Sequence, residues 1–488
     1  MSEEETKKPE LITKVSKFVP SVNKPDYKQS LNSRLKWSGV ALLCYFVLSH
    51  ITAVGLNESE QYQQFFYFQM VLGAKFGSLV TLGIGPIVTA GIILQLLVGS
   101  KIIKWDTTKP DGRKKFQSWN KVLAVSLCFI EATAFVLAGA LPVQEGMLIK
   151  LFVILQIAGG AIIIILLDDL VSKWGFGSGV SLFIAAGVAS QIVIGLLSPL
   201  ISANGRMVGA IPGMITSIIA GNFALSITYF IPILTTVIVF FAVLYISGIH
   251  VDIPLSFASL RGFGRTWSLK FLYASVIPVI FISALLANVQ MMGKFGATPT
   301  EDGGSCNFIG CFDSTGSAKS GAAYYLTSPR SFIVQVVDRV ILNQGGNLNQ
   351  TSTAQAYSTP FGKEMLRATT YGLFLAIGAM IFSIFWVNTA GMDAKSVAGQ
   401  LDSSGMQIPG YRKDPRIMES VLNRYIPALT VLGGIGIGLL AATADFLGAI
   451  GSGTGILLTI MIFHDLYDRL KQEDTDEAHP WVRKIVGD

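Results

Sequence analysis

Ten runs of about 20 predominantly apolar residues dominate this sequence of 488 residues. A helix of that length satisfies its own backbone hydrogen bonds across the hydrocarbon core of a bilayer, whereas the strands of a membrane barrel alternate over about ten residues. The runs therefore predict an all-α membrane protein with ten transmembrane helices. We place them at Trp37–Val54, Gly77–Val98, Val122–Leu141, Met147–Leu167, Val180–Leu200, Ile227–Gly248, Phe271–Met291, Thr369–Thr389, Tyr425–Ala444 and Ala449–Ile462.

Charged residues are too few to cover a water-facing surface. They make up 14% of the chain, whereas soluble domains carry about 25%. This deficit excludes an ordinary soluble enzyme, and a hydrophobic content of 51% excludes a disordered chain. The chain has only 4 cysteines, which excludes a scaffold held together by disulfides.

Three further apolar stretches, Tyr62–Ala74, Met207–Ile227 and Phe332–Leu342, are too short or too polar to span, and we interpret them as interfacial or re-entrant. Cytoplasmic loops of membrane proteins carry an excess of Lys and Arg. With ten spans and both termini in the cytoplasm, 28 of the 37 basic residues fall on the cytoplasmic side. Counting Met207–Ile227 as a span would move Arg261 and Arg265 outside. The charge distribution therefore favours ten spans and cytoplasmic termini.

The sequence offers little for catalysis or for cofactor binding. The acidic residues inside the runs are Glu131 and, at the end of the ninth run, Asp445. Glycine-rich stretches such as Gly175–Gly179 and Gly451–Gly455 follow no predicted strand and lack the Gly-Lys-Ser/Thr of a phosphate loop, so they favour close helix packing. The four histidines are scattered, and no Cys-His cluster has metal-ligand spacing. We expect no enzyme, no metal and no cofactor.

Two cysteines lie in the long loop that the topology places outside the membrane. Cys306 and Cys311 are five residues apart, on the side where a disulfide could persist. A bridge and two free thiols are both compatible with this spacing.

The second run is unusual because Thr81–Gly91 places three glycines and a proline within a predicted helix. In water, Gly costs a helix about 1 kcal/mol and Pro about 3 kcal/mol. Tight packing against a neighbour would explain this composition. A helix that bends or separates from its neighbours would explain it equally well.

Several stretches of the chain resemble the SecY family, the α subunit of the protein-conducting translocon, in its archaeal form. They are Leu82–Ile92, Gln95–Ser100, Leu167–Gly179, Ala322–Leu326 and Gly451–Gly455, in the family's order across nearly the whole chain. The resemblance implies two pseudo-symmetric five-helix halves around a central hourglass pore. The implied organisation is a cytoplasmic segment 1–36, a first half 37–200, an external linker 201–226, a second half 227–470 with cytoplasmic loops 248–270 and 390–424 and an external loop 292–367, and a cytoplasmic tail 471–488.

The resemblance also implies a function: the central channel-forming subunit of the Sec translocase passes secretory polypeptides and releases transmembrane helices sideways. A segment of about 57–75 corresponds to the plug that fills the closed channel. A narrow apolar constriction blocks ions because it dewets. The residues that match the family's apolar pore ring are Ile84, Val88, Val180, Ile184, Ile280 and Leu458, and those at its lateral gate are Thr89, Glu131 and Asn288.

The two basic cytoplasmic loops resemble those that dock the ribosome in the family, and Arg261, Arg265, Arg412 and Lys413 are the residues expected to reach its phosphates. The other implied partners are SecE (the γ subunit), a small β subunit, the signal-recognition targeting machinery, a nascent polypeptide with a signal sequence, and lipid of a plasma membrane. The external loop carries an insertion that the resemblance does not assign. The alternative function is a secondary transporter, which the scarcity of charge inside the runs disfavours.

Overall fold

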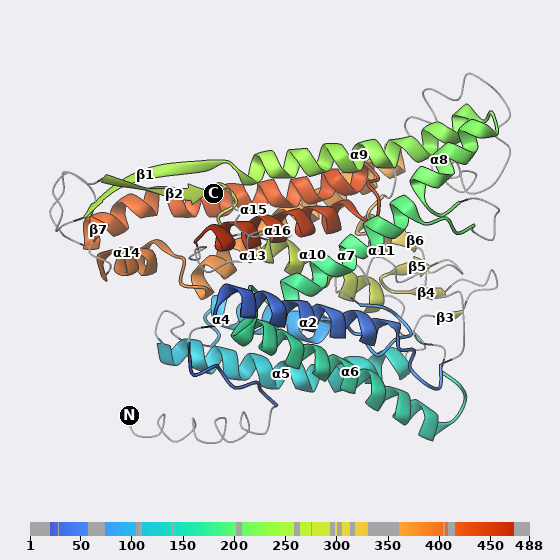
Figure 1. The fold of residues 1–488 in the computed structure, drawn as a ribbon, viewed down its shortest axis with the longest axis horizontal. Coiled ribbons are helices and arrows are strands. Elements are labelled where there is room, and N and C mark those ends of the chain that lie inside the picture. The colour runs from blue at the N-terminus through green and yellow to red at the C-terminus, as the bar shows by residue number, and fades with distance from the viewer. Residues whose placement is uncertain are drawn as a thin grey trace.

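The computed structural model describes residues 20–27, 29–56, 74–103, 105, 110–137, 141, 143–201, 207–257, 264–274, 276–292, 298–299, 305–312, 318–329, 361–403, 406–407 and 415–472. Within these residues the chain is mostly helical (Figure 1). Each predicted span overlaps one helix. These helices are α2 (Leu31–His50), α4 (Gly85–Gly99), α5 (Pro110–Leu137), α6 (Met147–Trp174), α7 (Gly179–Leu197), α9 (Phe223–Ser247), α10 (Ile277–Met292), α13 (Phe361–Thr389), α15 (Pro415–Phe446) and α16 (Gly453–Gln472).

By length and composition, 6 helices of the described chain can cross a membrane on their own, and α4 and α10 are shorter apolar helices. The prediction of an all-α, multi-pass membrane protein is thus confirmed. Helix α8 (Ala210–Ile219) has 10 residues, which is too short to cross a bilayer. The other two stretches that we interpreted as interfacial, Tyr62–Ala74 and Phe332–Leu342, lie outside the described residues except for Ala74.

The helices form two groups that lie side by side (Figure 1). Helices α2, α4, α5 and α6 make up one group, and α9, α13, α15 and α16 make up the other. Two helices connect them: α7 contacts α6 and α16, and α10 contacts α4 and α13. The contacts of α4 with α10 and α13 therefore form a seam between the groups, which we call the α4 seam.

Helix α4 begins eight residues later than the predicted second span, so the prediction of three glycines and a proline inside one helix is wrong. Gly83 precedes the helix with φ +53°, Gly85 is its first residue, and Pro86 lies in its first turn, where its missing N–H costs nothing. The residues before α4 form turns that pack closely against α6. A Cβ built at Gly160 of α6 would lie 1.9 Å from the carbonyl oxygen of Leu79. Gly83 of this run thus allows the chain break before α4, and Gly160 of α6 allows the close packing against it.

Glycines of α15 let this helix pack closely on α13. A Cβ built at Gly438 would lie 2.6 Å from the carbonyl oxygen of Leu375 and 2.7 Å from the Cα of Ala376. Backbone atoms cannot move aside as the end of a flexible side chain can. The two helices therefore approach each other only because this position has no side chain.

We expect Gly438→Val to lower the stability of the protein by about 1–3 kcal/mol, because it overpacks this contact. The midpoint of thermal unfolding in detergent measures the effect. Gly362→Ala is the matched control, because a Cβ built at Gly362 of α13 meets nothing within 4 Å. Equal midpoints for the two variants would contradict the packing role of Gly438.

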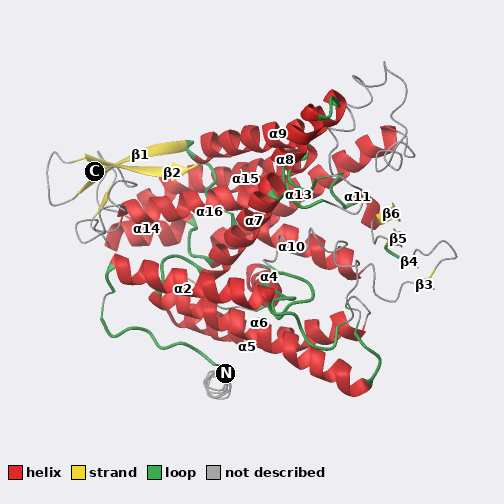
Figure 2. Ribbon diagram, turned by 45° about the vertical axis from the view of Figure 1, so that its right-hand side comes forward, coloured by secondary structure: helices red, strands yellow, loops and turns green. Residues whose placement is uncertain are grey.

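Two small sheets lie at opposite ends of the helices (Figure 2). Strands β1 (His250–Phe257) and β2 (Gly264–Lys270) form a hairpin, and β7 (Met406–Gln407) pairs with β1. At the other end, β3 (Thr298–Pro299), β4 (Ser305–Asn307), β5 (Gly310–Phe312) and β6 (Ala318–Gly321) form a four-stranded sheet, which short helix α11 (Ala322–Tyr325) follows.

The β1–β7 pairing joins the two loops that the sequence analysis assigns to the cytoplasm. A separate hydrophobic cluster lies beneath this sheet, and helix α14 (Ala394–Ser403) contributes Val397 and Leu401 to it. Ile253 of β1, Val387 of α13 and Leu422 of α15 belong to the same cluster. The two loops are therefore packed as one unit against the ends of α13 and α15.

Candidate channel and lateral seam

The six residues that match the pore ring come from four different helices. Ile84 is the N-cap residue of α4 and Val88 lies in its first turn. Val180 and Ile184 lie on α7, Ile280 on α10 and Leu458 on α16. Five of the six are buried and belong to the main hydrophobic core cluster; Val180 is half-buried and packs against it. Side chains up to 374 positions apart in the sequence thus belong to, or pack against, one hydrophobic core that extends over both helix groups.

Two of the three residues assigned to the lateral gate are in contact. The Thr89 side chain on α4 lies within hydrogen-bonding reach of the Glu131 carboxyl group on α5. Asn288 lies half-buried on α10, a helix that contacts α4. Among the described residues, no hydrogen bond joins Asn288 to the other two. This contact joins α4 to α5, which belong to the same helix group, so it does not itself cross the α4 seam.

Aromatic side chains join α10 to α13, the two helices that contact α4 at the seam. The ring centroid of Phe281 on α10 lies 5.8 Å from that of Phe382 and 6.4 Å from that of Trp386, both on α13, and both pairs have edge-to-face geometry. Such pairs contribute about 0.5–1.5 kcal/mol each beyond their buried area. Sequence reasoning missed this cluster, because aromatic residues in an apolar run carry no signal of which helix they will meet.

Asp168 and Asp169, which the topology placed just beyond the fourth span, hold the end of α6. Asp168 Oδ1 accepts a hydrogen bond of 2.9 Å from the backbone N–H of Val180 at the start of α7. Asp169 lies 2.8 Å from Lys121 Nζ and 2.7 Å from Lys173 Nζ. These carboxylates therefore fix the α6–α7 turn and tie α5 to α6.

The N-terminal segment is fastened to the same joint. Asp169 also accepts a hydrogen bond of 2.9 Å from the backbone N–H of Val22, and Lys173 Nζ donates to the carbonyl of Val22. Trp174 Nε1 donates to the carbonyl of Asn23 at 2.7 Å. Most of these bonds reach main-chain atoms, so the sequence of the N-terminal segment gave no indication of them.

A second buried acid makes a similar joint between α13, α15 and α16. Asp445 accepts hydrogen bonds from the Tyr371 hydroxyl at 2.7 Å, the Thr454 hydroxyl at 2.6 Å and the Thr454 backbone N–H at 3.0 Å. A Cβ built at Gly453 would lie 1.9 Å from the Ala444 carbonyl carbon. The available sequence signal was the same in both joints: an acid beside a glycine-rich turn.

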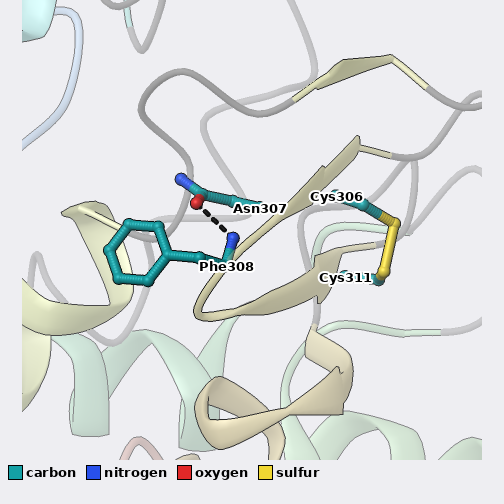
Figure 3. The surroundings of a disulfide bond; sticks show 4 residues. All are labelled: Cys306, Asn307, Phe308 and Cys311. Atoms are coloured by element: carbon teal, nitrogen blue, oxygen red, sulfur yellow. Dashed lines mark hydrogen bonds between the residues drawn. A yellow bond between two sulfur atoms is a disulfide. The ribbon is translucent and has the colours of Figure 1, made fainter.

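In the structure, Cys306 and Cys311 face each other across β4 and β5 and form a disulfide (Figure 3). The bridge closes the hairpin, and the Asn307 side chain turns back to accept a hydrogen bond from the backbone N–H of Phe308. The Phe308 side chain is 91% exposed at the tip. This hairpin belongs to the insertion that the resemblance left unassigned.

Polar contacts tie helix α11 to the start of α13. The Tyr324 hydroxyl donates to Glu364 Oε1 at 2.6 Å, and Arg367 Nε donates to the Thr327 carbonyl at 2.9 Å. The Arg367 guanidinium also lies 4.6 Å from the centre of the Tyr324 ring. Burial and the hydrogen bond to Glu364 raise the pKa of Tyr324 to about 12, so its hydroxyl remains a donor at neutral pH.

The remaining predicted sites fall largely outside the described residues. Arg261, Arg412 and Lys413 lie outside them, as does the predicted plug up to residue 73. Arg265 lies on β2, where its backbone pairs with that of Leu255. Within the part of the chain that the structure describes, no group of three or more His, Cys, Asp or Glu residues could hold a metal ion.

Comparison with known proteins gives one consistent result. The family model described as SecY matches residues 78–467. The chain is 39% identical to the protein translocase subunit SecY of Pyrococcus furiosus over 98% of this chain and 99% of that protein. It is 40% identical to that of Methanococcus vannielii, with the same coverage of both chains.

Solved structures agree with the sequence comparison. A structure of a protein-conducting channel superposes with a TM-score of 0.75 at 37% identity, and the match covers 96% of this chain and 98% of that chain. Sec61 in the canine ribosome-channel complex from the endoplasmic reticulum matches with a TM-score of 0.73, also at 37% identity and with the same coverage. The motifs, the ten-helix fold and full-length similarity lead to one conclusion: the chain belongs to the SecY family.

Proposed function

We propose that this protein is the central channel-forming subunit of a Sec protein translocase, which passes secretory polypeptides across the membrane. The observation that supports the proposal is that six aliphatic side chains at the predicted ring positions, from α4 and its N-cap, α7, α10 and α16, lie in or against one buried hydrophobic core. An apolar constriction of this kind excludes water and ions, yet its flexible side chains can surround a passing peptide. It offers no charged group with which to bind a small solute.

The α4 seam supplies a lateral exit for transmembrane helices. Helix α4 contacts α10 and α13 of the other helix group, and in this proposal these contacts separate when an apolar segment leaves the channel. Thr89, Glu131 and Asn288 form the polar part of the gate. The segment that precedes α4, residues 57–75, acts as the plug.

One relative supports the ribosome as a partner, and the other proposed partners follow from the family resemblance. The channel in the canine complex is bound to a ribosome, and in this protein the joined loops of β1, β2 and β7 would present Arg261, Arg265, Arg412 and Lys413 to it. SecE and a small β subunit complete a heterotrimer in the plasma membrane, with both termini in the cytoplasm. The signal-recognition machinery delivers nascent chains that carry a signal sequence.

Site-directed crosslinking of a stalled secretory chain tests the channel. Photoreactive side chains at positions 84, 184 and 458 should label the stalled chain, because these positions are buried at the proposed constriction. Leu155, which is 53% exposed on α6, provides a control position on the proposed lipid-facing surface. Labelling at Leu155 without labelling at the three buried positions would refute the channel.

Charge reversal at Arg412 is expected to weaken ribosome binding. Each contact between a basic side chain and a phosphate releases counterions, so the loss of one should reduce the slope of log affinity against log salt by roughly 1. Co-sedimentation of purified complex with ribosomes at several salt concentrations measures this slope. Charge reversal at Lys319, an exposed residue of the opposite sheet, should leave the slope unchanged. Identical slopes for both variants would contradict the docking role.

A further inference from the structure

One stripe of helix α4 faces the seam with two glycines and a glutamine. Gly91, Gln95 and Gly99 follow each other at four-residue spacing, so they lie above one another on a slowly turning face. A Cβ built at Gly91 would lie 3.7 Å from Phe281 Cζ of α10. A Cβ built at Gly99 would lie 2.7 Å from Phe385 Cδ1 of α13 and 3.4 Å from its Cβ. Each glycine therefore leaves room for an aromatic ring, that of Phe281 on α10 at Gly91 and that of Phe385 on α13 at Gly99, and we call these two positions sockets.

The two sockets differ in how much room they leave. At Gly91 an added methyl group would make ordinary contact with the Phe281 ring, whereas at Gly99 it would overlap the Phe385 ring. The overlap involves Phe385 Cδ1 at 2.7 Å and Cγ at 3.1 Å, whereas Cβ at 3.4 Å is in ordinary contact, so the Phe385 side chain or the helix must shift to relieve it. The α4–α13 contact at Gly99 is thus the tighter of the two.

Gln95 lies between the sockets and is in an unfavourable environment. Its side chain belongs to a residue that is only 2% exposed, and among the described residues its Oε1 atom has no hydrogen-bond partner. A buried acceptor without a donor destabilises the closed seam. When the seam separates, the acceptor regains water or meets a donor from the entering polypeptide. The sockets therefore favour the closed seam, and Gln95 favours the open one.

We propose that the Gly91–Phe281 and Gly99–Phe385 sockets, together with Gln95, determine how apolar a polypeptide segment must be to leave through the seam. This inference rests on the proposed channel function. An entering segment must replace the ring contacts with its own apolar surface, and a backbone N–H or a hydroxyl on the segment can satisfy Gln95 Oε1. The residues that select the substrate thus include Gly91, Gln95 and Gly99 of α4 in addition to the polar gate.

A graded series of test segments measures this selection. The full complex in vesicles receives secretory chains that carry a 19-residue segment with an increasing number of leucines among alanines, and protease protection separates released from translocated product. For a segment near the wild-type midpoint, we expect Gly99→Ala to raise the ratio of released to translocated product several-fold, since it forces the seam apart. Gln95→Leu should lower that ratio, by about tenfold if the unpaired oxygen has its usual effect.

Matched controls are available in the same chain. Gly39→Ala adds a methyl group to α2 where nothing lies within 4 Å, so it should leave the midpoint unchanged. Gln191→Leu on α7 removes another amide oxygen that has no partner among the described residues, but away from the seam, and it should also have no effect. If Gln95→Leu shifts the midpoint no more than Gln191→Leu does, the role of Gln95 is overturned.

A compensating pair keeps the test valid if a larger variant folds poorly. Gly99→Val fills the socket, and adding Phe385→Ala empties the opposite side, so the double variant should return toward the wild-type midpoint. A double variant that is no closer to wild type than Gly99→Val would overturn the socket.

A photoreactive side chain at Thr89 separates this inference from the function on which it rests. If the test segments never label that position, the proposed lateral gate is wrong. Labelling at Thr89 with unchanged midpoints in all seam variants would refute the sockets and Gln95 alone.

Discussion

Replacement of Ile84, Val88 and Ile280 together by glycine should open a continuous leak for ions. The three side chains come from α4 and α10 and are at most 4% exposed, so their removal empties one side of the proposed constriction. A dewetted aliphatic constriction excludes ions by keeping water out, and a wider, backbone-lined passage fills with water. We expect the conductance of reconstituted protein to rise at least about tenfold over the wild type.

The control for this experiment must account for the effect of glycine on the helices themselves. Each glycine inside a helix costs roughly 1 kcal/mol, so a damaged fold could also leak. Ile93→Gly, Leu96→Gly and Leu373→Gly together remove three aliphatic side chains that are at least 36% exposed on α4 and α13. A comparable conductance in the two triple variants would attribute the leak to general damage and sink the assignment of the ring.

Restoring bulk without the original shape provides a second check. Leucine at positions 84 and 280 keeps the volume of isoleucine, and such exchanges usually cost less than about 1.5 kcal/mol. We expect this double variant to conduct no more than the wild type, because the seal depends on apolar volume rather than on one side-chain shape. A higher conductance than that of the wild type would instead indicate that the closure depends on a specific side-chain contact.

The spans were predictable because the bilayer itself imposes their length. Their ends were less predictable where charged residues continue a helix. Helix α13 starts eight residues before the predicted eighth span, and Glu364 and Arg367 in this extension are held by α11. Helix α15 starts ten residues before the predicted ninth span because Met418 and Leu422 pack in the cluster beneath the β1–β2–β7 sheet. Hydropathy alone does not report such packing.

The candidate site likewise contains some residues that were predictable from the sequence and others that were not. Glu131 stood out in the sequence because an acid in an apolar run is rare, whereas Thr89 was assigned only through the family resemblance; in the structure the two residues lie close together. Gly99 and Phe385 are 286 positions apart and chemically ordinary, so only the folded chain shows that one fits the other. Gln95 begins one of the stretches that resemble the family, but the sequence gave no physical reason to assign it a role. Its burial in the structure supplies one.

Asp445 is the residue on which the channel and the small-solute transporter make opposite predictions. It is 6% exposed and accepts hydrogen bonds from Tyr371 and from both the hydroxyl and the backbone N–H of Thr454. Thr454 lies in the first turn of α16, where the positive end of the helix dipole stabilises a carboxylate. In a transporter, a buried acid of this kind is an ion site; here its acceptor atoms are occupied by the protein itself.

Asp445→Leu should therefore lower the stability of the protein and should not change how that stability depends on ions. It leaves three buried donors without acceptors, each worth about 1–3 kcal/mol, so the expected loss is on the order of several kcal/mol. Tyr371→Phe removes one donor together with its need for a partner and should cost about 1 kcal/mol. Thermal unfolding in detergent, with and without added sodium and at pH 6 and 8, measures both. If the Asp445 variant keeps the stability of the wild type and differs from it only in its response to sodium or protons, the transporter is favoured. The channel predicts a loss of stability, because a carboxylate that holds three helices together cannot be removed without loosening them.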